Sequence, residues 1–246
     1  MDHRYTISTL KDEGLPVSPG WCQEGFSIHM DATIDIKQEV LDSALWLSEN
    51  NYFGSHLSSG GNVSARVPGE NLFAVTPSSV PYNELSPEDI CLLDFDLNRL
   101  EGDLKPSIEA GMHAAIYKAR PDVGAVAHTH QFHASIFSVL NTPIPPLFDE
   151  ITMHIGNQVA VVPYAISGTD ALAAQVGDAV TNGCACFIMQ NHGALNLGGS
   201  LKQALRNAEF LEKIAKVYHS ALATGRPVTT LPDHALAFWD EIRQTL

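Results

Sequence analysis

The segment of residues 104–133 constrains the fold more than any other part of the chain. It combines a short helical pattern with a buried apolar strand that ends at His128 and His130. Side chains two residues apart on a strand point to the same side, so these two imidazoles are expected to face one point in space. A third histidine, His192, follows the expected strand 184–189 and precedes a glycine. If the two strands are neighbours, the three histidines converge.

Three imidazoles that leave one coordination position open are typical of a catalytic zinc-type site. Neutral imidazole also binds manganese, cobalt and iron, so the pattern predicts a divalent metal, with zinc first, and does not fix its identity. The chain has 11 histidines, and a pair with this spacing can also arise by chance. We interpret four further histidines as supporting or surface residues: His113, His133, His154 and His219.

Glu109 lies in the first turn of the expected helix, just upstream of the strand that carries His128 and His130. A carboxylate in the first turn is stabilised by the helix dipole. Because glutamates are common at helix starts, only its place before the histidine strand makes Glu109 a candidate acid or base. Ser107 is expected to cap the helix. The buried face is expected to contain Ile108, Met112, Ala115 and Ile116.

Short apolar segments alternate with helical ones along the chain. Expected strands cover residues 63–67, 72–75, 90–95, 123–127, 159–162 and 184–189. Expected helices cover residues 34–50, 132–140, 169–180, 201–223 and 232–245. Residues 1–32 are polar and irregular and are interpreted as an N-terminal extension, which leaves residues 33–246 as one domain. This order predicts the α/β class, as a three-layer α/β/α fold with a mostly antiparallel central sheet.

Charge and hydropathy exclude several classes of partner. The net charge is −14 without any basic run, which argues against nucleic acid and against an anionic membrane surface. No run of about 18 apolar residues is present, so no membrane span is expected. Cys184 and Cys186 are more simply core residues than a metal pair. The sequence therefore predicts a soluble, reduced, cytoplasmic protein that acts on a small molecule.

Three short turns carry hydroxyl and amide donors. They are the glycine-rich turn at residues 60–62, the pair Ser78 and Ser79, and Ser107. Such donors, together with a helix N-terminus, can hold an anion such as phosphate. Glycine and serine also fill ordinary turns, so no single one of these turns identifies a phosphate site.

Five motifs occur in order along the chain. They are GNVSAR at residues 61–66, TPSS followed by PYNEL at 76–85, KPSIE at 105–109, HTH at 128–130 and NHG at 191–193. As an ordered set they make the chain resemble the class II aldolase/adducin family, which includes aldolases, epimerases and decarboxylases. The resemblance covers about residues 34–225, and the N-terminal extension lies outside it.

The resemblance implies an α/β/α fold and a divalent metal held by His128, His130 and His192, with Glu109 as the catalytic acid or base. It also implies a homotetramer with active sites between subunits. In the aldolases of this family, the phosphate pocket is lined by the residues that match Ser59, Asn62, Ser78, Ser79 and Ser107.

Two departures from the aldolase pattern bear on the substrate. The aldolases commonly carry TPSG or TPTG and then PSSE, whereas this chain has Ser79 and Ile108 at the changed positions. An isoleucine cannot donate a hydrogen bond to phosphate, so the pocket can take a carboxylate or a less polar group instead. An aldolase of the family has a proton-donating tyrosine near the position of Asp149, and none stands here. Asp149 is counted with the substrate-binding candidates.

The implied function is a metal-dependent carbon–carbon lyase. The first expectation is an aldolase that cleaves a ketose phosphate or a related hydroxy-ketone through a metal-stabilised enediolate. A decarboxylase of a hydroxylated or aromatic carboxylic acid uses the same stabilisation and remains the alternative, which the two departures favour. A non-enzymatic adducin-like interaction module is a third possibility, but such a module is expected to lack the metal histidines, and all three are present.

Overall fold

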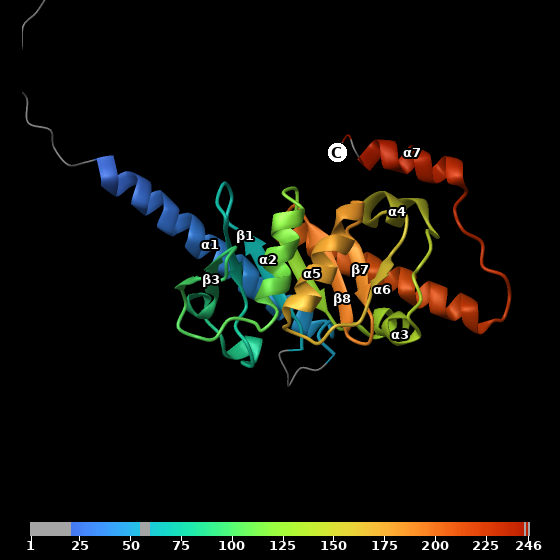
Figure 1. Cartoon of the computed structure of the whole chain (residues 1–246), viewed down its shortest axis with the longest axis horizontal. Coiled ribbons are helices and arrows are strands. Elements are labelled where there is room, and N and C mark those ends of the chain that lie inside the picture. The colour runs from blue at the N-terminus through green and yellow to red at the C-terminus, as the bar shows by residue number, and fades with distance from the viewer. Residues whose placement is uncertain (1–20, 55–59, 244, 246) are drawn as a thin grey trace, which may run out of the picture.

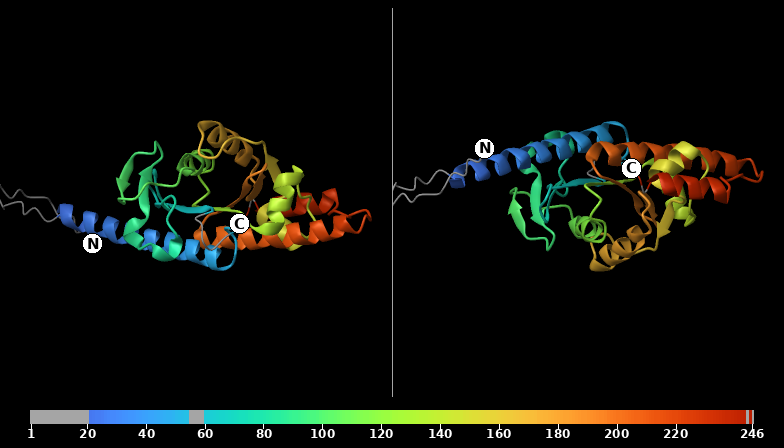
Figure 2. Two further views of the ribbon diagram at one scale, coloured as in Figure 1. Left: turned by 90° about the horizontal axis from the view of Figure 1, so that it is seen from below. Right: turned by 90° about the horizontal axis from the view of Figure 1, so that it is seen from above.

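One eight-stranded sheet runs through the molecule, and helices cover both of its faces in the computed structural model (Figures 1 and 2). The structure describes residues 21–54, 60–243 and 245. Ser59 and residues 1–20 lie outside the described residues. The predicted α/β/α architecture with a mostly antiparallel sheet is confirmed.

The strands follow the order β4-β3-β2-β1-β5-β8-β7-β6 across the sheet. All neighbouring pairs are antiparallel except β6 and β7. The strands are β1 (Asn62–Arg66), β2 (Leu72–Val75), β3 (Cys91–Asp94), β4 (Arg99–Glu101), β5 (Ala125–Thr129), β6 (Ala160–Val162), β7 (Cys186–Met189) and β8 (Gly193–Gly198).

Two groups of helices pack on opposite faces of this sheet (Figure 2). Helices α2 and α5 cover one face, while α1, α3, α4 and α6 cover the other, and α7 lies against α4. None of the helices that the structure describes is both long and apolar enough to cross a membrane. The helices are α1 (Trp21–Glu49), α2 (Ala110–Ala119), α3 (Phe132–Leu140), α4 (Asp149–Ile155), α5 (Asp170–Ala179), α6 (Leu201–Ala223) and α7 (Asp233–Arg243), with 3₁₀ turns at Tyr82–Glu84, Pro87–Asp89 and Val180–Asn182.

The sheet register brings the motifs together. Strand β5 lies between β1 and β8, with Asn62 opposite His128 on one side and Ala194 opposite Thr129 on the other. The sequence prediction depended on the strand before His192 being the neighbour of the histidine strand. In the structure this strand, β7, is not the neighbour of β5, because β8 lies between them. His192 still reaches β5, because it stands in the tight turn from β7 into β8.

Two predicted helix starts are wrong. Helix α1 begins at Trp21 and not at residue 34, so residues 21–32 are helical. Helix α2 begins at Ala110, after a turn in which Ser107 accepts hydrogen bonds from the amides of Glu109 and Ala110. Because Ile108 belongs to this turn, its side chain is 54% exposed and is not part of the buried helix face. The buried face of α2 contains Met112, His113, Ala114, Ile116 and Tyr117.

Candidate active site

Three imidazoles meet at the end of β5. His128 is fully buried near the end of the strand, His130 follows the strand, and His192 stands in the β7–β8 turn. One ring nitrogen from each lies within 4.8 Å of those of the other two. The Nε2 atoms of His128 and His130 are 3.0 Å apart. The structure thus brings together all three histidines that the sequence selected as metal ligands.

The protonation of these rings suits a cation. Nδ1 of His128 donates to the Ala194 carbonyl at 2.9 Å, which leaves the lone pair of Nε2 directed at the other two histidines. Burial lowers the pKa of His128, and burial with the neighbouring imidazoles lowers the pKa of His130 to about 3. Neutral imidazole is the form that binds a metal. The donor set therefore fits one divalent metal ion.

The glycine of the NHG motif makes this convergence possible. A Cβ atom on Gly193 would lie 2.5 Å from Cδ2 of His130 and 2.6 Å from the Thr129 carbonyl oxygen. Both distances are far below van der Waals contact. Any side chain at this position would push the β7–β8 turn away from β5 and separate His192 from the other two ligands.

Glu109 faces the same point from the start of α2. Its Oε2 lies 3.3 Å from Nε2 of His128, and its Oε1 lies 3.1 Å from Nε2 of His192. Asn62 donates to Oε2 at 2.8 Å, and no donor of the described residues forms a well-aligned hydrogen bond with Oε1. Burial by itself raises the pKa of Glu109, whereas positive charge on His128 or His192, when these rings are protonated, and the hydrogen bond from Asn62 lower it. An ionised carboxylate with one free oxygen at a cluster of imidazole nitrogens can exchange a proton with a bound substrate.

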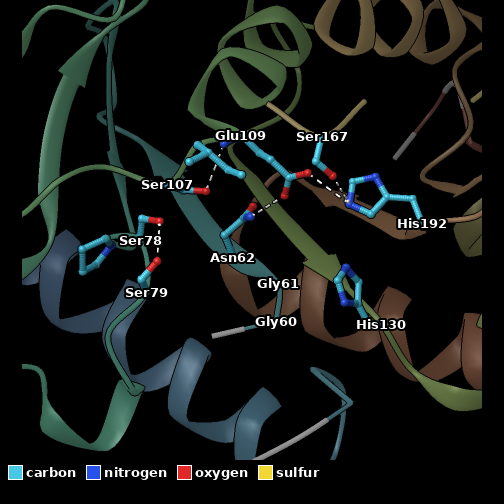
Figure 3. A pocket seen from close by; sticks show the side chains of 12 residues that line it. Gly60, Gly61, Asn62, Ser78, Ser79, Ser107, Glu109, His130, Ser167 and His192 are labelled. Atoms are coloured by element: carbon cyan, nitrogen blue, oxygen red, sulfur yellow. Dashed lines mark hydrogen bonds and ion pairs between the residues drawn. The ribbon is translucent and has the colours of Figure 1, made fainter. Parts of the chain in front are cut away.

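A cavity of about 240 Å³ opens from this centre. Figure 3 shows its two ends, with Ser78 and Ser79 at one and His192 and Ser167 at the other, while Glu109 lies between them. The glycine-rich turn forms part of the wall, where the Tyr82 hydroxyl donates to the Gly61 carbonyl at 2.6 Å. Among the residues that the structure describes, neither lysine nor arginine lines the cavity. An anionic group there would depend on neutral donors.

Hydroxyl groups are the available donors at the serine end. The amide of Ser78 already donates to the Lys105 carbonyl at 2.8 Å, and the amide of Ser107 donates to the Thr76 carbonyl at 3.1 Å. The hydroxyls of Ser78 and Ser79 lie 3.1 Å apart. The backbone of Ser79 has φ +65°, a conformation that glycine adopts with less strain. A ligand at this end would contact serine hydroxyls and the exposed side chain of Ile108.

Two residues of the site were not selected from the sequence. Ser167, in the loop between β6 and α5, places its hydroxyl 3.2 Å from Nε2 of His192 and lines the cavity. Its immediate sequence, SGT, reads as an ordinary helix-start turn and carries no signal of this role. His113 was assigned a supporting or surface position, and it is fully buried beside Asn62.

Of the substrate-binding candidates, Asp149 is not brought to the cavity, and one other cannot be placed. Asp149 is exposed at the start of α4, where its Oδ1 accepts a hydrogen bond from Nε1 of Trp239 at 2.6 Å. It does not line this cavity in the described part of the chain. Ser59 lies outside the described residues. The predicted substrate contacts of both residues stay predictions.

Known proteins are similar to this chain in sequence and in fold. An L-fuculose phosphate aldolase from Escherichia coli O6:H1 is 35% identical over 202 residues, which cover 82% of this chain and 91% of that protein. A 5-deoxy-D-ribulose 1-phosphate aldolase from Bacillus thuringiensis serovar kurstaki is 32% identical over 168 residues, covering 68% and 78%. The solved structure of an L-fuculose 1-phosphate aldolase is similar with a TM-score of 0.79 and 32% identity, covering 85% of this chain and 96% of that one.

Residues 38–219 match the family model described as Class II Aldolase and Adducin N-terminal domain. The match covers well over half of the 246 residues and contains every motif that builds the cavity and the histidine cluster. The chain therefore belongs to the class II aldolase and adducin family.

Proposed function

We propose that this protein is a divalent-metal-dependent carbon–carbon lyase, an aldolase that cleaves a ketose phosphate or a related hydroxy-ketone. The observation that carries the proposal is the buried Glu109 carboxylate, which lies within 3.3 Å of ring nitrogens of His128 and His192. Relatives named as aldolases of fuculose phosphate and of 5-deoxyribulose 1-phosphate support the substrate class.

His128, His130 and His192 would hold the metal, with zinc as the first choice because neutral imidazoles around a vacant position suit it. A divalent cation at this point supplies positive charge that stabilises the negative charge formed on substrate oxygens as a carbon–carbon bond breaks. Manganese, cobalt and iron accept the same ligands, so elemental analysis of the purified protein decides the metal.

Glu109 would handle the proton of the reaction. In cleavage, the hydroxyl group on the departing carbon loses a proton as the aldehyde forms, and the carbon that keeps the bonding electrons gains one; in the reverse direction both transfers run backwards. The carboxylate faces the cavity with Oε1 free of an aligned donor, while Asn62 holds Oε2. Ser78, Ser79 and Ser107 would bind the polar end of the substrate through their hydroxyls, so that its reacting carbons lie beside Glu109.

A decarboxylase of a hydroxylated or aromatic carboxylic acid is the second candidate function. The side chain of Ile108 lines the cavity and is 54% exposed, where an aldolase pattern carries a second serine. This residue offers an apolar surface in place of a donor to phosphate. In this reaction the substrate carboxylate would leave as carbon dioxide, and the same cation would stabilise the negative charge left behind. Glu109 would deliver a proton to the carbon that keeps the bonding electrons.

A substrate panel separates the two functions. The metal-loaded protein is incubated with ketose 1-phosphates and with hydroxy-acids, and the release of aldehyde and of carbon dioxide is measured. Aldehyde from a ketose 1-phosphate supports the aldolase. Carbon dioxide without any aldehyde supports the decarboxylase, and a protein that binds no metal and turns over neither class excludes both.

We further propose that the chain assembles as a homotetramer with cavities near its subunit boundaries. Apolar side chains are exposed in the single chain at the cavity, where Ile108 lies, and next to cavity-lining residues in the sequence, as with Phe132 at 72% and Ile166 at 65%. Subunit association would cover such a surface. Asp149, which lies away from the cavity of its own chain, remains a candidate for substrate contact in a neighbouring subunit.

A further inference from the structure

A continuous row of polar side chains runs behind Glu109. The Tyr117 hydroxyl lies 2.7 Å from Oγ of Ser64, and Oγ of Ser64 lies 2.6 Å from Nδ1 of His113. Nε2 of His113 lies 2.5 Å from Oδ1 of Asn62, whose Nδ2 lies 2.8 Å from Oε2 of Glu109. The row therefore connects α2 to β1 and back to the start of α2, and it ends at the carboxylate.

The topology explains why these residues meet. Asn62 and Ser64 are two residues apart on β1, so they point to the same face of the sheet. His113 and Tyr117 are four residues apart on α2, so they lie on the same side of the helix that covers this face. Each pair is thus placed by regular secondary structure rather than by a loop, and the row has little freedom to rearrange.

The direction of the hydrogen bonds in the row follows from the orientation of Asn62. Its Nδ2 donates to Oε2 of Glu109, so its carbonyl oxygen faces His113. Nε2 of His113 must then carry a hydrogen and donate it. Because burial, followed by the charge of His128, lowers the pKa of His113 to about 3, the ring is neutral and Nδ1 has no hydrogen. The Ser64 hydroxyl therefore donates to Nδ1 and accepts from Tyr117.

Burial prevents water from replacing the inner partners of this row, because Ser64, His113 and Tyr117 are buried and do not line the cavity. Asn62 and Glu109 are buried too, but they line the cavity. An asparagine side chain can exchange its oxygen and nitrogen by rotating half a turn, and here the wrong orientation would place its carbonyl against the carboxylate. A donor on the far side of Asn62 further disfavours that orientation, and His113 supplies it.

We propose that His113 is a positioning residue for the reaction: by donating from Nε2 to Asn62, it fixes the amide so that Asn62 donates to Glu109 and holds the carboxylate at the histidine cluster. This inference rests on the proposed role of Glu109 as the acid or base. His113 itself touches neither the cavity nor the substrate, since it does not line the cavity in the described residues.

The protonation state of His113 can be measured without any substrate. With ¹⁵N-labelled histidine, the full-length protein should show a His113 ring that carries hydrogen on Nε2 and none on Nδ1 at pH 7. The resonance is assigned by its loss in His113→Gln. A hydrogen on Nδ1, or on both nitrogens, would overturn the proposal whatever the enzyme turns over.

Two substitutions at His113 separate positioning from simple core packing. Glutamine carries an N–H at the same reach as Nε2, whereas leucine has a similar volume and no donor. We expect His113→Leu to keep its metal and to lose kcat by about 10- to 100-fold, the usual cost of losing a residue that orients a catalytic group. His113→Gln should restore kcat to within about fivefold of the wild type.

The matched control is Asn207→Ala, which removes another buried side-chain donor, the one that reaches the Leu197 carbonyl at 2.7 Å far from the cavity. It should lower Tm and leave kcat within twofold. Equal losses of kcat in His113→Gln and His113→Leu, or an unchanged kcat in His113→Leu with full metal, would contradict the positioning role. A wild-type protein that cleaves no tested substrate would defeat the proposed function alone, because the nitrogen assignment stands apart from turnover.

Discussion

At the scale of single residues, the centre depends on one carboxylate and three imidazoles that have no other strong partners on the cavity side. Glu109 contacts His128, His192 and Asn62, and it is the only acidic residue in the described cavity lining. The negative charge of Glu109 favours a cation at the histidine cluster, and its ability to carry a proton serves the proposed reaction.

Glu109→Gln keeps the shape of the side chain and removes its ability to exchange a proton. The three histidine ligands remain, so we expect a full complement of metal and a loss of kcat of about 10²- to 10⁴-fold. Metal content by elemental analysis and kcat on the best substrate of the panel are measured side by side. Turnover within tenfold of the wild type would remove Glu109 from its assigned role.

His130→Ala removes one of the three ring nitrogens. Two imidazoles bind a divalent cation much more weakly than three, so metal and activity should be lost together. The matched control is His133→Ala, because Nδ1 of His133 pairs with Glu212 at 2.6 Å and the ring lines no part of the cavity. The control should retain its metal, and a metal-replete His130→Ala variant would exclude this ligand set.

Residue types with a strong chemical preference were the ones that the sequence predicted best. His128, His130, His192 and Glu109 were selected from spacing and from the family motifs, and they meet at one point in the structure. Ser167 and His113 were not assigned to the site, because serine and histidine also fill turns and cores. Their contacts come from residues 25 and 51 positions away in the sequence, which no local pattern encodes.

At the scale of secondary-structure elements, the β7–β8 turn decides whether the centre forms. It delivers His192 to a strand that lies beyond β8, and it can do so only while Gly193 packs directly on Thr129 and His130. Residues 193–198, where no strand was expected, form β8, which pairs with both β5 and β7.

Gly193→Ala tests this contact. Its Cβ would lie 2.5 Å from His130 and 2.6 Å from a backbone oxygen, so the turn must shift, and we expect a loss of bound metal together with a lower Tm. Gly199→Ala is the matched control, because its Cβ meets nothing closer than Oε1 of the flexible Gln203 at 3.4 Å. Normal metal content in Gly193→Ala would show that the turn tolerates the displacement.

Most elements were predicted with the right type, and the failures have identifiable causes. The helix expected over residues 169–180 is α5, and Thr169 caps it by accepting a hydrogen bond from the Leu172 amide. Helix α2 starts later than predicted because Pro106 pairs with Pro77 in an isolated bridge and Ser107 closes a turn. Helix α4 was left unassigned, since seven residues are too few for a clear periodicity.

At the scale of the whole molecule, the exposed apolar residues around the cavity predict association. If the proposed tetramer forms, light scattering behind size-exclusion chromatography should give about four times the chain mass of 26.6 kDa. Phe132→Ser should shift the mass toward smaller species, because Phe132 is the most exposed large apolar side chain of the described residues. Surface substitution Lys216→Ser, on the exposed side of α6, is the control. A monomeric wild type would contradict the assembly proposal.

The arrangement of the sheet was predicted in class but not in detail. Alternating apolar segments indicate helices packed on a sheet, and the family motifs indicate the α/β/α fold. The strand order depends on which distant segments pair, and hydrophobic periodicity does not indicate which strands are neighbours. The insertion of β8 between β5 and β7 is therefore visible only in the assembled molecule.

The interior position of β5 also governs how a bound ion would escape. Ladder bonds hold β5 on both sides, and interior strands are the last parts of a protein to open. His128, which lies on this strand, thus keeps its position through the smaller fluctuations of the chain. A bound ion would then leave by breaking its coordination bonds one after another while the strand stays folded. A chelator should therefore remove it far more slowly than the loops open and close.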